Sequence, residues 1–264
     1  MFYFLSSDSR LLGKSIQPFT KSHLSTAESI FDAVASLVKI DLREHSVSVP
    51  VYDFSFPSTG NSFHTLQKIS TSAFNSYFYR KHSEWQTLDP IFAICGWGLP
   101  RQSEIYHGKH YSPFGSDSIF EDHVKNSFTY ISMGIGMSEI ATLMHYVESM
   151  NSHGPLYRYK KTFFGTHNIG NIGYQVSIDM HCRPKGLQLE YDVDRLNSDL
   201  LHDGVVSPYL NLEKWFSASA RELFDYWNEK RKIDPLYFLS PNSRQEIDKK
   251  LQTLGRPFTL SDFE

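Results

Sequence analysis

The amino-acid sequence predicts a mixed α/β fold in which helices cover one sheet. Segments with apolar residues at helical spacing alternate along the chain with short apolar or alternating segments typical of strands. The chain has 264 residues, of which 40% are hydrophobic and 21% charged, so it carries enough apolar sequence for a buried core. We expect a single α/β domain over residues 1–210, with a helical C-terminal extension over residues 211–264 packed on it.

The first part of the chain is predicted to contain two helices and a strand region. Residues 26–39 carry apolar side chains at helical spacing, and Ser25 with Glu28 is expected to form a capping box at the start of this helix. Residues 45–56 alternate, which predicts an edge strand or two short strands. A second helix is expected over residues 63–84, where apolar side chains again follow a helical period.

The middle of the chain is predicted to form strand, loop, strand and helix. The apolar run over residues 91–97 predicts a buried strand. Residues 101–126 show no clear period, so we expect a long loop with one short helix. A short strand at 128–132 then leads, through two glycines, to a helix over 137–150.

The last part of the chain is predicted to contain strands followed by helices. Residues 157–164 and 174–182 are candidate strands, and residues 187–193 are a candidate for one more. An amphipathic helix is expected over 212–232, and a short polar helix over 243–254.

Composition and charge exclude several classes of function. The net charge of −3 argues against a non-specific nucleic-acid binder. Cys95 and Cys182 are too few for a disulfide scaffold, and the sequence contains no metal-binding motif, so no metal is expected. No apolar run reaches the roughly 18–20 residues that span a bilayer, and the N-terminus lacks a secretory signal. We therefore expect a cytoplasmic protein with no membrane span and no nucleic-acid partner.

Aromatic residues are unusually frequent, at 15% of the chain. Aromatic side chains bury large areas, and they also line apolar ligand pockets. The content therefore fits a bulky core or a pocket for a small apolar molecule.

A strand–glycine–helix unit is the strongest local motif. Gly134 and Gly136 separate the expected strand at 128–132 from the helix at 137–150. Glycines at a strand end let the backbone approach a ligand, and the helix that follows offers unpaired N–H groups to a phosphate. The dinucleotide-binding fingerprint is excluded because Glu139 stands where its third glycine belongs. The motif is compatible with a phosphate or pantetheine cradle and with a tight structural turn.

A second glycine-rich segment, residues 165–173, joins two expected strands. Its glycines and asparagines suit a hairpin or a bulge. The polar side chains of Thr166, His167 and Asn168 are alternative candidates for contacts with a substrate.

Three segments, taken in order, resemble the acyl-homoserine-lactone synthases, whose fold is similar to that of the GNAT acyltransferases. Residues 79–85 (YRKHSEW) resemble an early stretch with Arg and Trp, and residues 91–101 resemble the strand that follows and ends near Leu-Pro. Residues 130–139 resemble the strand, acyl-carrier-binding bulge and helix of that family. The resemblance implies a GNAT-like mixed sheet flanked by helices.

The resemblance also implies a reaction, acyl transfer from a carrier thioester to an amine. In a lactone synthase, ring closure on S-adenosylmethionine follows. Acyl carrier thioester and S-adenosylmethionine are then the substrates, acyl carrier protein is a partner, and no cofactor is permanently bound. The amine must lose a proton before it attacks, for which we expect Glu139 as the base, with Glu121 and Asp122 as the alternatives. The hydroxyl of Ser132 and the backbone N–H groups of Met133 and Gly134 are expected to hold the thioester oxyanion.

Further substrate contacts are expected from positively charged and aromatic side chains. Arginines bind carboxylate or phosphate through paired hydrogen bonds, and aromatic rings line an acyl pocket. The remaining residues expected to bind substrate are Arg80, Trp85, Arg101, Phe128, Tyr130, Gly136 and Thr166.

Two functions without catalysis stay open beside acyl transfer. A sensory domain that captures a small apolar signal molecule also fits an aromatic-rich α/β chain with a long central loop. An adaptor or effector with exposed aromatic side chains is the third interpretation. Binding of a carrier-linked acyl group favours the enzyme, and binding of a free small molecule without turnover favours the sensor.

Overall fold

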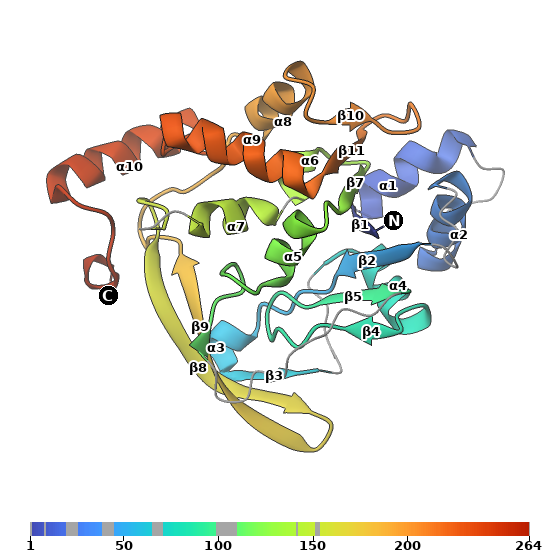
Figure 1. Ribbon diagram of the computed structural model, residues 1–264, viewed down its shortest axis with the longest axis horizontal. Helices are drawn as coiled ribbons and strands as arrows, with labels where there is room; N and C mark the ends of the chain where they lie inside the picture. Colours follow the sequence, from blue (N-terminus) through green and yellow to red (C-terminus); the bar gives the residue numbers. More distant parts are fainter. Residues whose placement is uncertain are drawn as a thin grey trace.

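The computed structural model shows a mixed α/β molecule with two sheets (Figure 1). The residues that it describes are 2–7, 9–19, 26–38, 45–64, 71–98, 110–140, 142–150 and 154–263.

The main sheet has seven strands in the order β10-β11-β7-β1-β2-β5-β4. The central strand β1 pairs in parallel with β2 and β7, whereas the outer pairs β2–β5, β4–β5, β7–β11 and β10–β11 are antiparallel, so the sheet is mixed. The strands are β1 (Phe2–Ser7), β2 (Ser46–Pro50), β4 (Trp85–Gln86), β5 (Ile94–Trp97), β7 (Thr129–Met133), β10 (Ser207–Pro208) and β11 (Trp215–Ser219).

Successive side chains of each strand point to opposite faces of this sheet. Because apolar side chains occur on both faces, helices cover both of them. Phe4 and Tyr130 belong to one buried cluster, and their neighbours Leu5 and Ile131 belong to the other. The second cluster includes apolar residues of α1 (Ser9–Ile16), α2 (Ala27–Val38) and α4 (Ala73–Lys81). The first cluster lies under α5 (Ile119–Lys125), α6 (Met137–Ile140), α7 (Leu143–Ser149), α8 (Val193–His202) and α9 (Ala220–Ile233).

A second, four-stranded sheet has the order β3-β8-β9-β6. Its long strands β8 (Tyr159–Ile169) and β9 (Ile172–Cys182) form a hairpin, which curves along one side of the molecule in Figure 1. Gly170, with a φ of 59°, supplies the left-handed backbone that the tight turn needs. Short strands β3 (Asn61–Phe63) and β6 (His110–Tyr111) flank the hairpin, and α3 (Phe56–Thr59) precedes β3.

The C-terminal helix α10 (Pro241–Leu254) packs on a third, smaller apolar cluster. A short 3₁₀ turn at Leu260–Asp262 follows, and a similar turn at Gln17–Phe19 follows α1. Ile247 of α10 belongs to this cluster together with Tyr157, Tyr159, Leu189 and Phe258.

Several predicted elements are confirmed. The helix expected at 26–39 is α2, and the strand expected at 91–97 contains β5. Ser25 of the expected capping box lies outside the described residues, and Thr26 exchanges hydrogen bonds with Ser29 instead, Thr26 Oγ1 accepting from the Ser29 N–H at 3.1 Å. The glycine-rich segment is a hairpin, with its strands extending almost to the turn.

Three predictions about helices were wrong. Residues 212–219 do not begin a helix, because Trp215 to Ser219 pair with β7 as β11 and the helix α9 starts only at Ala220. The helix expected at 137–150 is divided, since α6 packs against α8 and α7 packs against α9. The helix expected at 63–84 is present as α4, but its start was wrong, because Phe63 lies in β3. The division of the chain at residue 210 stays a prediction.

The candidate strand at residues 187–193 is also not a full strand. Tyr191 forms an isolated antiparallel bridge with Leu239, and the helix α8 begins at Val193. Backbone hydrogen bonds from Asp192 N–H to Phe238 and from Ser240 N–H to Glu190 connect this segment to the residues that precede α10.

In the part of the chain that the structure describes, no helix is both long and apolar enough to cross a membrane.

Candidate functional site

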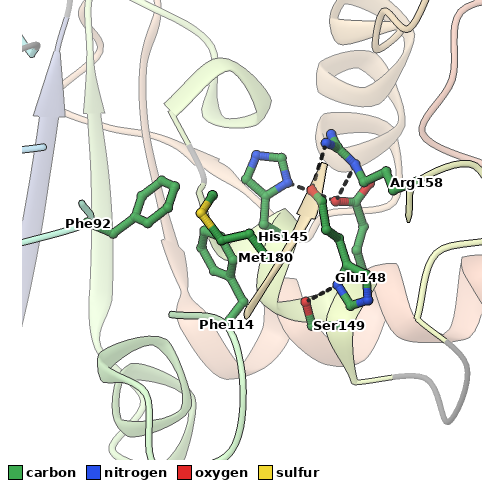
Figure 2. A pocket seen from close by; sticks show the side chains of 8 residues that line it. Phe92, Phe114, His145, Glu148, Ser149, Arg158 and Met180 are labelled. Carbon is green, nitrogen blue, oxygen red and sulfur yellow. Dashed lines mark hydrogen bonds and ion pairs between the residues drawn. The ribbon is translucent and has the colours of Figure 1, made fainter. Parts of the chain in front are cut away.

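A pocket of about 80 Å³ lies between α7 and the base of the β8–β9 hairpin (Figure 2). One side is polar and the other is aromatic. The lining residues are Phe92, Phe114, His145, Glu148, Ser149, Arg158, Met180 and His181.

A histidine and a glutamate on α7 form the polar centre of the pocket. His145 and Glu148 are three residues apart, which places both side chains on one face of the helix. His145 Nδ1 lies 2.8 Å from Glu148 Oε2, and the ionised carboxylate only accepts hydrogen bonds, so Nδ1 is the donor. Figure 2 shows the other ring nitrogen turned away from Glu148. The His145 side chain is 31% exposed and lines the pocket, so a ligand there can contact the imidazole.

Glu148 is held ionised by its surroundings. Its side chain is only 2% exposed, and burial alone raises the pKa of a carboxyl group. The nearby Arg158 guanidinium and the hydrogen bonds from His145 and Tyr157 outweigh burial and hold the pKa of Glu148 well below its usual range. Tyr157 and Tyr191 donate to Oε1 at 2.6 and 2.7 Å.

Arg158, which precedes β8, joins this carboxylate to the hairpin. Its side chain is 6% exposed, and its Nε lies 3.4 Å from Glu148 Oε2. One terminal nitrogen donates to the hydroxyl of Tyr191 at 2.5 Å and the other to the backbone carbonyl of His181 at 3.4 Å. Burial lowers the pKa of a guanidinium, but Glu148 and the two tyrosines raise the pKa of Arg158 overall, so it stays charged.

A second polar pair, Ser149 with His181, lies beside the first. Ser149 Oγ and His181 Nδ1 are 3.3 Å apart. Burial lowers the pKa of His181, so this imidazole is neutral near pH 7. Gly154 lies against the ring with a φ of 65°, and a Cβ there would be 2.5 Å from His181 Nε2.

The opposite wall of the pocket is aromatic and apolar. The rings of Phe92 and Phe114 have centroids 4.6 Å apart, and Phe114 meets the His145 ring edge-on at 5.3 Å. Met180 on β9 completes this wall. A ligand that fills the pocket therefore has the His145 imidazole on one side and carbon-rich surface on the other.

The residues expected to be catalytic lie elsewhere. Glu139 is exposed and accepts a hydrogen bond from Asn197 at 2.7 Å. Ser132 is fully buried, and its hydroxyl donates to the backbone carbonyl of Phe216 at 3.5 Å. Met133 ends β7, and Gly134 follows it with a φ of 76°.

The other expected substrate-binding residues are dispersed over the fold. Phe128 and Tyr130 are buried in the core, where the Tyr130 hydroxyl lies 2.8 Å from His123 Nδ1. Arg80 is exposed on α4, and Trp85 packs its ring on Gly96. Gly136 is buried, and a Cβ at this position would collide with Asn197 and Glu139. Thr166 is on β8, and Arg101 lies outside the described residues. None of the described ones lines the pocket, and their proposed roles stay predictions.

None of the residues that line the pocket was predicted from the sequence as a site residue. The His145–Glu148 pair had a local signal, because a histidine and a glutamate three residues apart lie inside a predicted helix. Arg158 and His181 had none, since they reach the pocket only through the hairpin. Among the described residues, no group of three or more His, Cys, Asp or Glu is placed to hold a metal ion.

Solved structures with a similar fold are acetyltransferases. The aminoglycoside acetyltransferase AAC(3)-IVa, as a histidine-to-alanine mutant in complex with a gentamicin, is 14% identical with a TM-score of 0.62, and the match covers 95% of this chain and 90% of that chain. AAC-IIIb in a binary complex with CoASH is 10% identical, with a TM-score of 0.60 and coverage of 90% and 91%. The fold of this chain is therefore similar to that of these two proteins.

A third similar structure is the YokD protein from Bacillus subtilis, which is 9% identical with a TM-score of 0.60 over 87% of this chain and 91% of that chain. A scan against protein-family models finds no match, and a search of curated proteins finds none either. The expected GNAT-like class, a mixed sheet flanked by helices, is confirmed. The comparisons give the lactone synthases in particular no support.

Proposed function

We propose that this chain transfers an acyl group from a thioester to a primary amine, with His145 as the general base. One observation carries the proposal. The 2.8 Å contact from His145 Nδ1 to the buried carboxylate of Glu148 fixes the proton on Nδ1 and leaves the Nε2 lone pair available in the pocket.

The chemistry needs such a base because the nitrogen of a neutral amine becomes positively charged as it bonds to the carbonyl carbon, and it must give up a proton for the amide to form. The amine nitrogen bonds to the thioester carbonyl carbon while His145 Nε2 takes one of its protons. The tetrahedral intermediate then expels the thiolate as the carbon–sulfur bond breaks, and the imidazolium returns its proton to the sulfur. The products are an amide and a free thiol. Glu148 stabilises the imidazolium between these steps, as a buried carboxylate beside the ring does best.

Coenzyme A is the proposed carrier of the acyl group. Support comes from the similar fold of AAC-IIIb, whose structure was determined with CoASH. The finer expectation, a lactone synthase that uses S-adenosylmethionine and acyl carrier protein, has no support from the similar structures. In this proposal His145 replaces Glu139 as the base, because Glu139 is exposed and accepts a hydrogen bond from Asn197.

The test is thiol release from acetyl-CoA in the presence of three amines, namely tyramine, glucosamine and gentamicin, with the acetylated product identified by mass spectrometry. We expect at least one amide, and a loss of at least about 100-fold in kcat for His145→Gln, because a positioned general base contributes roughly 10²–10⁴-fold.

The chain offers a matched control. His202 is also paired with a carboxylate, that of Asp203 at 2.8 Å, but its side chain is 87% exposed and outside the pocket. His202→Gln should keep full activity. Equal activity of wild type and His145→Gln, or no acylation of any amine, would refute the proposal and leave the small-molecule sensor as the better interpretation.

A further inference from the structure

We propose that the acceptor of this pocket is a monoamine carried on a flat, apolar ring, and not a polycationic aminoglycoside. The proposal rests on the proposed acyl transfer, and it names the class of amine that the site selects.

The pocket is short of negative charge for a polycation. Among the described residues that line it, Glu148 is the only carboxylate, and its side chain is 2% exposed. Its two oxygens already accept from His145, Tyr157 and Tyr191 and face the Arg158 guanidinium. Each ammonium group of a polycation needs a partner when it leaves water, and this carboxylate has no capacity left for one.

The cation behind the pocket, Arg158, is already paired with Glu148. The buried Arg158 guanidinium faces the same space as the two imidazoles of His145 and His181. The Arg158 charge is balanced by Glu148, so neither group is left to pair with an entering ammonium, whereas burial against the apolar wall favours the neutral form of a single amine. Only this neutral amine attacks a thioester, so the environment that disfavours a polycation prepares a monoamine for reaction.

The opposite wall has the shape and chemistry to hold a flat ring. Phe92, Phe114 and Met180 offer two aromatic rings and a thioether, which pack well on an aromatic or otherwise flat ring. Because the Phe114 ring lies edge-on to the His145 ring, with centroids 5.3 Å apart, a flat ring held against Phe114 would also lie close to the imidazole. Figure 2 shows the aromatic side chains on one side of His145 and the Glu148–Arg158 pair on the other.

The proposed acceptor separates this chain from its structural neighbours. The protein of similar fold AAC(3)-IVa was crystallised with a gentamicin, an aminoglycoside. In the present chain, the same type of fold surrounds a pocket whose described lining suits a different amine.

The experiment compares tyramine with gentamicin as acceptors of acetyl-CoA, at 50 and 300 mM NaCl. We expect kcat/KM for tyramine to exceed that for gentamicin by at least about 10-fold, with little dependence on salt, because apolar contacts are not screened. Phe114→Leu, which keeps an apolar side chain in the wall, should raise KM for tyramine several-fold and leave the value for gentamicin unchanged. Phe164→Leu is the matched control, since that ring is 75% exposed on β8.

Equilibrium dialysis of both amines decides the proposal independently of turnover. Tyramine retained by the unaltered protein, and retained less by Phe114→Leu, supports it even if none of the amines is acetylated and the proposed function fails. A 10-fold preference for gentamicin that falls with salt would overturn the proposed acceptor while the proposed function stands. Retention of neither amine would overturn it as well.

Discussion

Glu148→Gln is the most informative single change in the molecule. The substitution keeps the shape of the side chain and removes its negative charge. That charge is paired with the buried Arg158 and hydrogen-bonded to His145, Tyr157 and Tyr191. The change therefore acts on the stability of the fold and on the proposed base at the same time.

The expected loss of stability is large because the Arg158 guanidinium, 6% exposed, would keep its charge without a counterion. Removing one partner of a buried ion pair costs roughly 3–5 kcal/mol. For a chain of this size, each kcal/mol shifts Tm by about 2–4 °C, so we expect Tm to fall by roughly 10 °C. The rate of the proposed acyl transfer should fall by at least about 10-fold, because a neutral amide does not stabilise the imidazolium as a carboxylate does.

Thermal unfolding followed by circular dichroism at several pH values checks the reasoning. The pKa of Glu148 is depressed in the folded state, so its stabilising contribution is complete above the unfolded value of 4.5 and is lost as pH falls through the lower folded value. The difference in Tm between wild type and Glu148→Gln should therefore be constant from pH 5 to 8 and shrink below pH 4.5.

The matched control is Glu229→Gln, which breaks an exposed ion pair between Glu229 and Lys232. Such pairs contribute roughly 0–1 kcal/mol, so its Tm should change little. If Glu148→Gln melted within about 2 °C of wild type, the buried pair would not hold the hairpin to α7, and the reasoning behind the site would be refuted.

Two other experiments, one on glycine substitutions and one on thiol labelling, have definite expected outcomes. Gly154→Ala should lower Tm and activity together, because the new methyl group meets His181 Nε2 at 2.5 Å on a left-handed backbone. Gly186→Ala has the same backbone strain with open space around it, so a smaller loss of Tm and unchanged activity are expected, and equal losses of activity would contradict the contact with His181. Burial raises the pKa of Cys95 to about 12, so iodoacetamide at pH 8 should leave this thiol unlabelled by mass spectrometry until the chain is unfolded.

Local patterns in the sequence were enough to predict the fold class and the elements with a strong period. The helix α2 and the β8–β9 hairpin are examples, because periodicity and turn chemistry are encoded within a few neighbouring residues. Trp215 and Phe216 were misjudged for the opposite reason. Their strand exists because it pairs with β7, which lies more than 80 residues earlier in the chain. The helix α8 was not predicted at all.

Local sequence patterns could not predict the site, for the same reason. Its residues come from α7, from the position just before β8, from the end of β9 and from the segments that hold Phe92 and Phe114, and only the fold brings these together. The glycine motif at Gly134 and Gly136 has the local features of a ligand loop, yet the described pocket lies elsewhere. His145 and Glu148, three residues apart within a predicted helix, were the local signal of this site.

The turn at the tip of the hairpin decides which residues reach the pocket at its base. Eleven cross-strand pairs run in register from Ile169 opposite Ile172 down to Tyr159 opposite Cys182. A shift of one residue at the turn would move every side chain of β9 to the opposite face, and it would place Cys182 where His181 now pairs with Lys160. The two residues of the turn thus set the alignment of the pocket from the far end of the hairpin. A one-residue insertion between Gly170 and Asn171 that shifted this register would turn the His181 side chain away from the site, although the insertion lies at the far end of the hairpin.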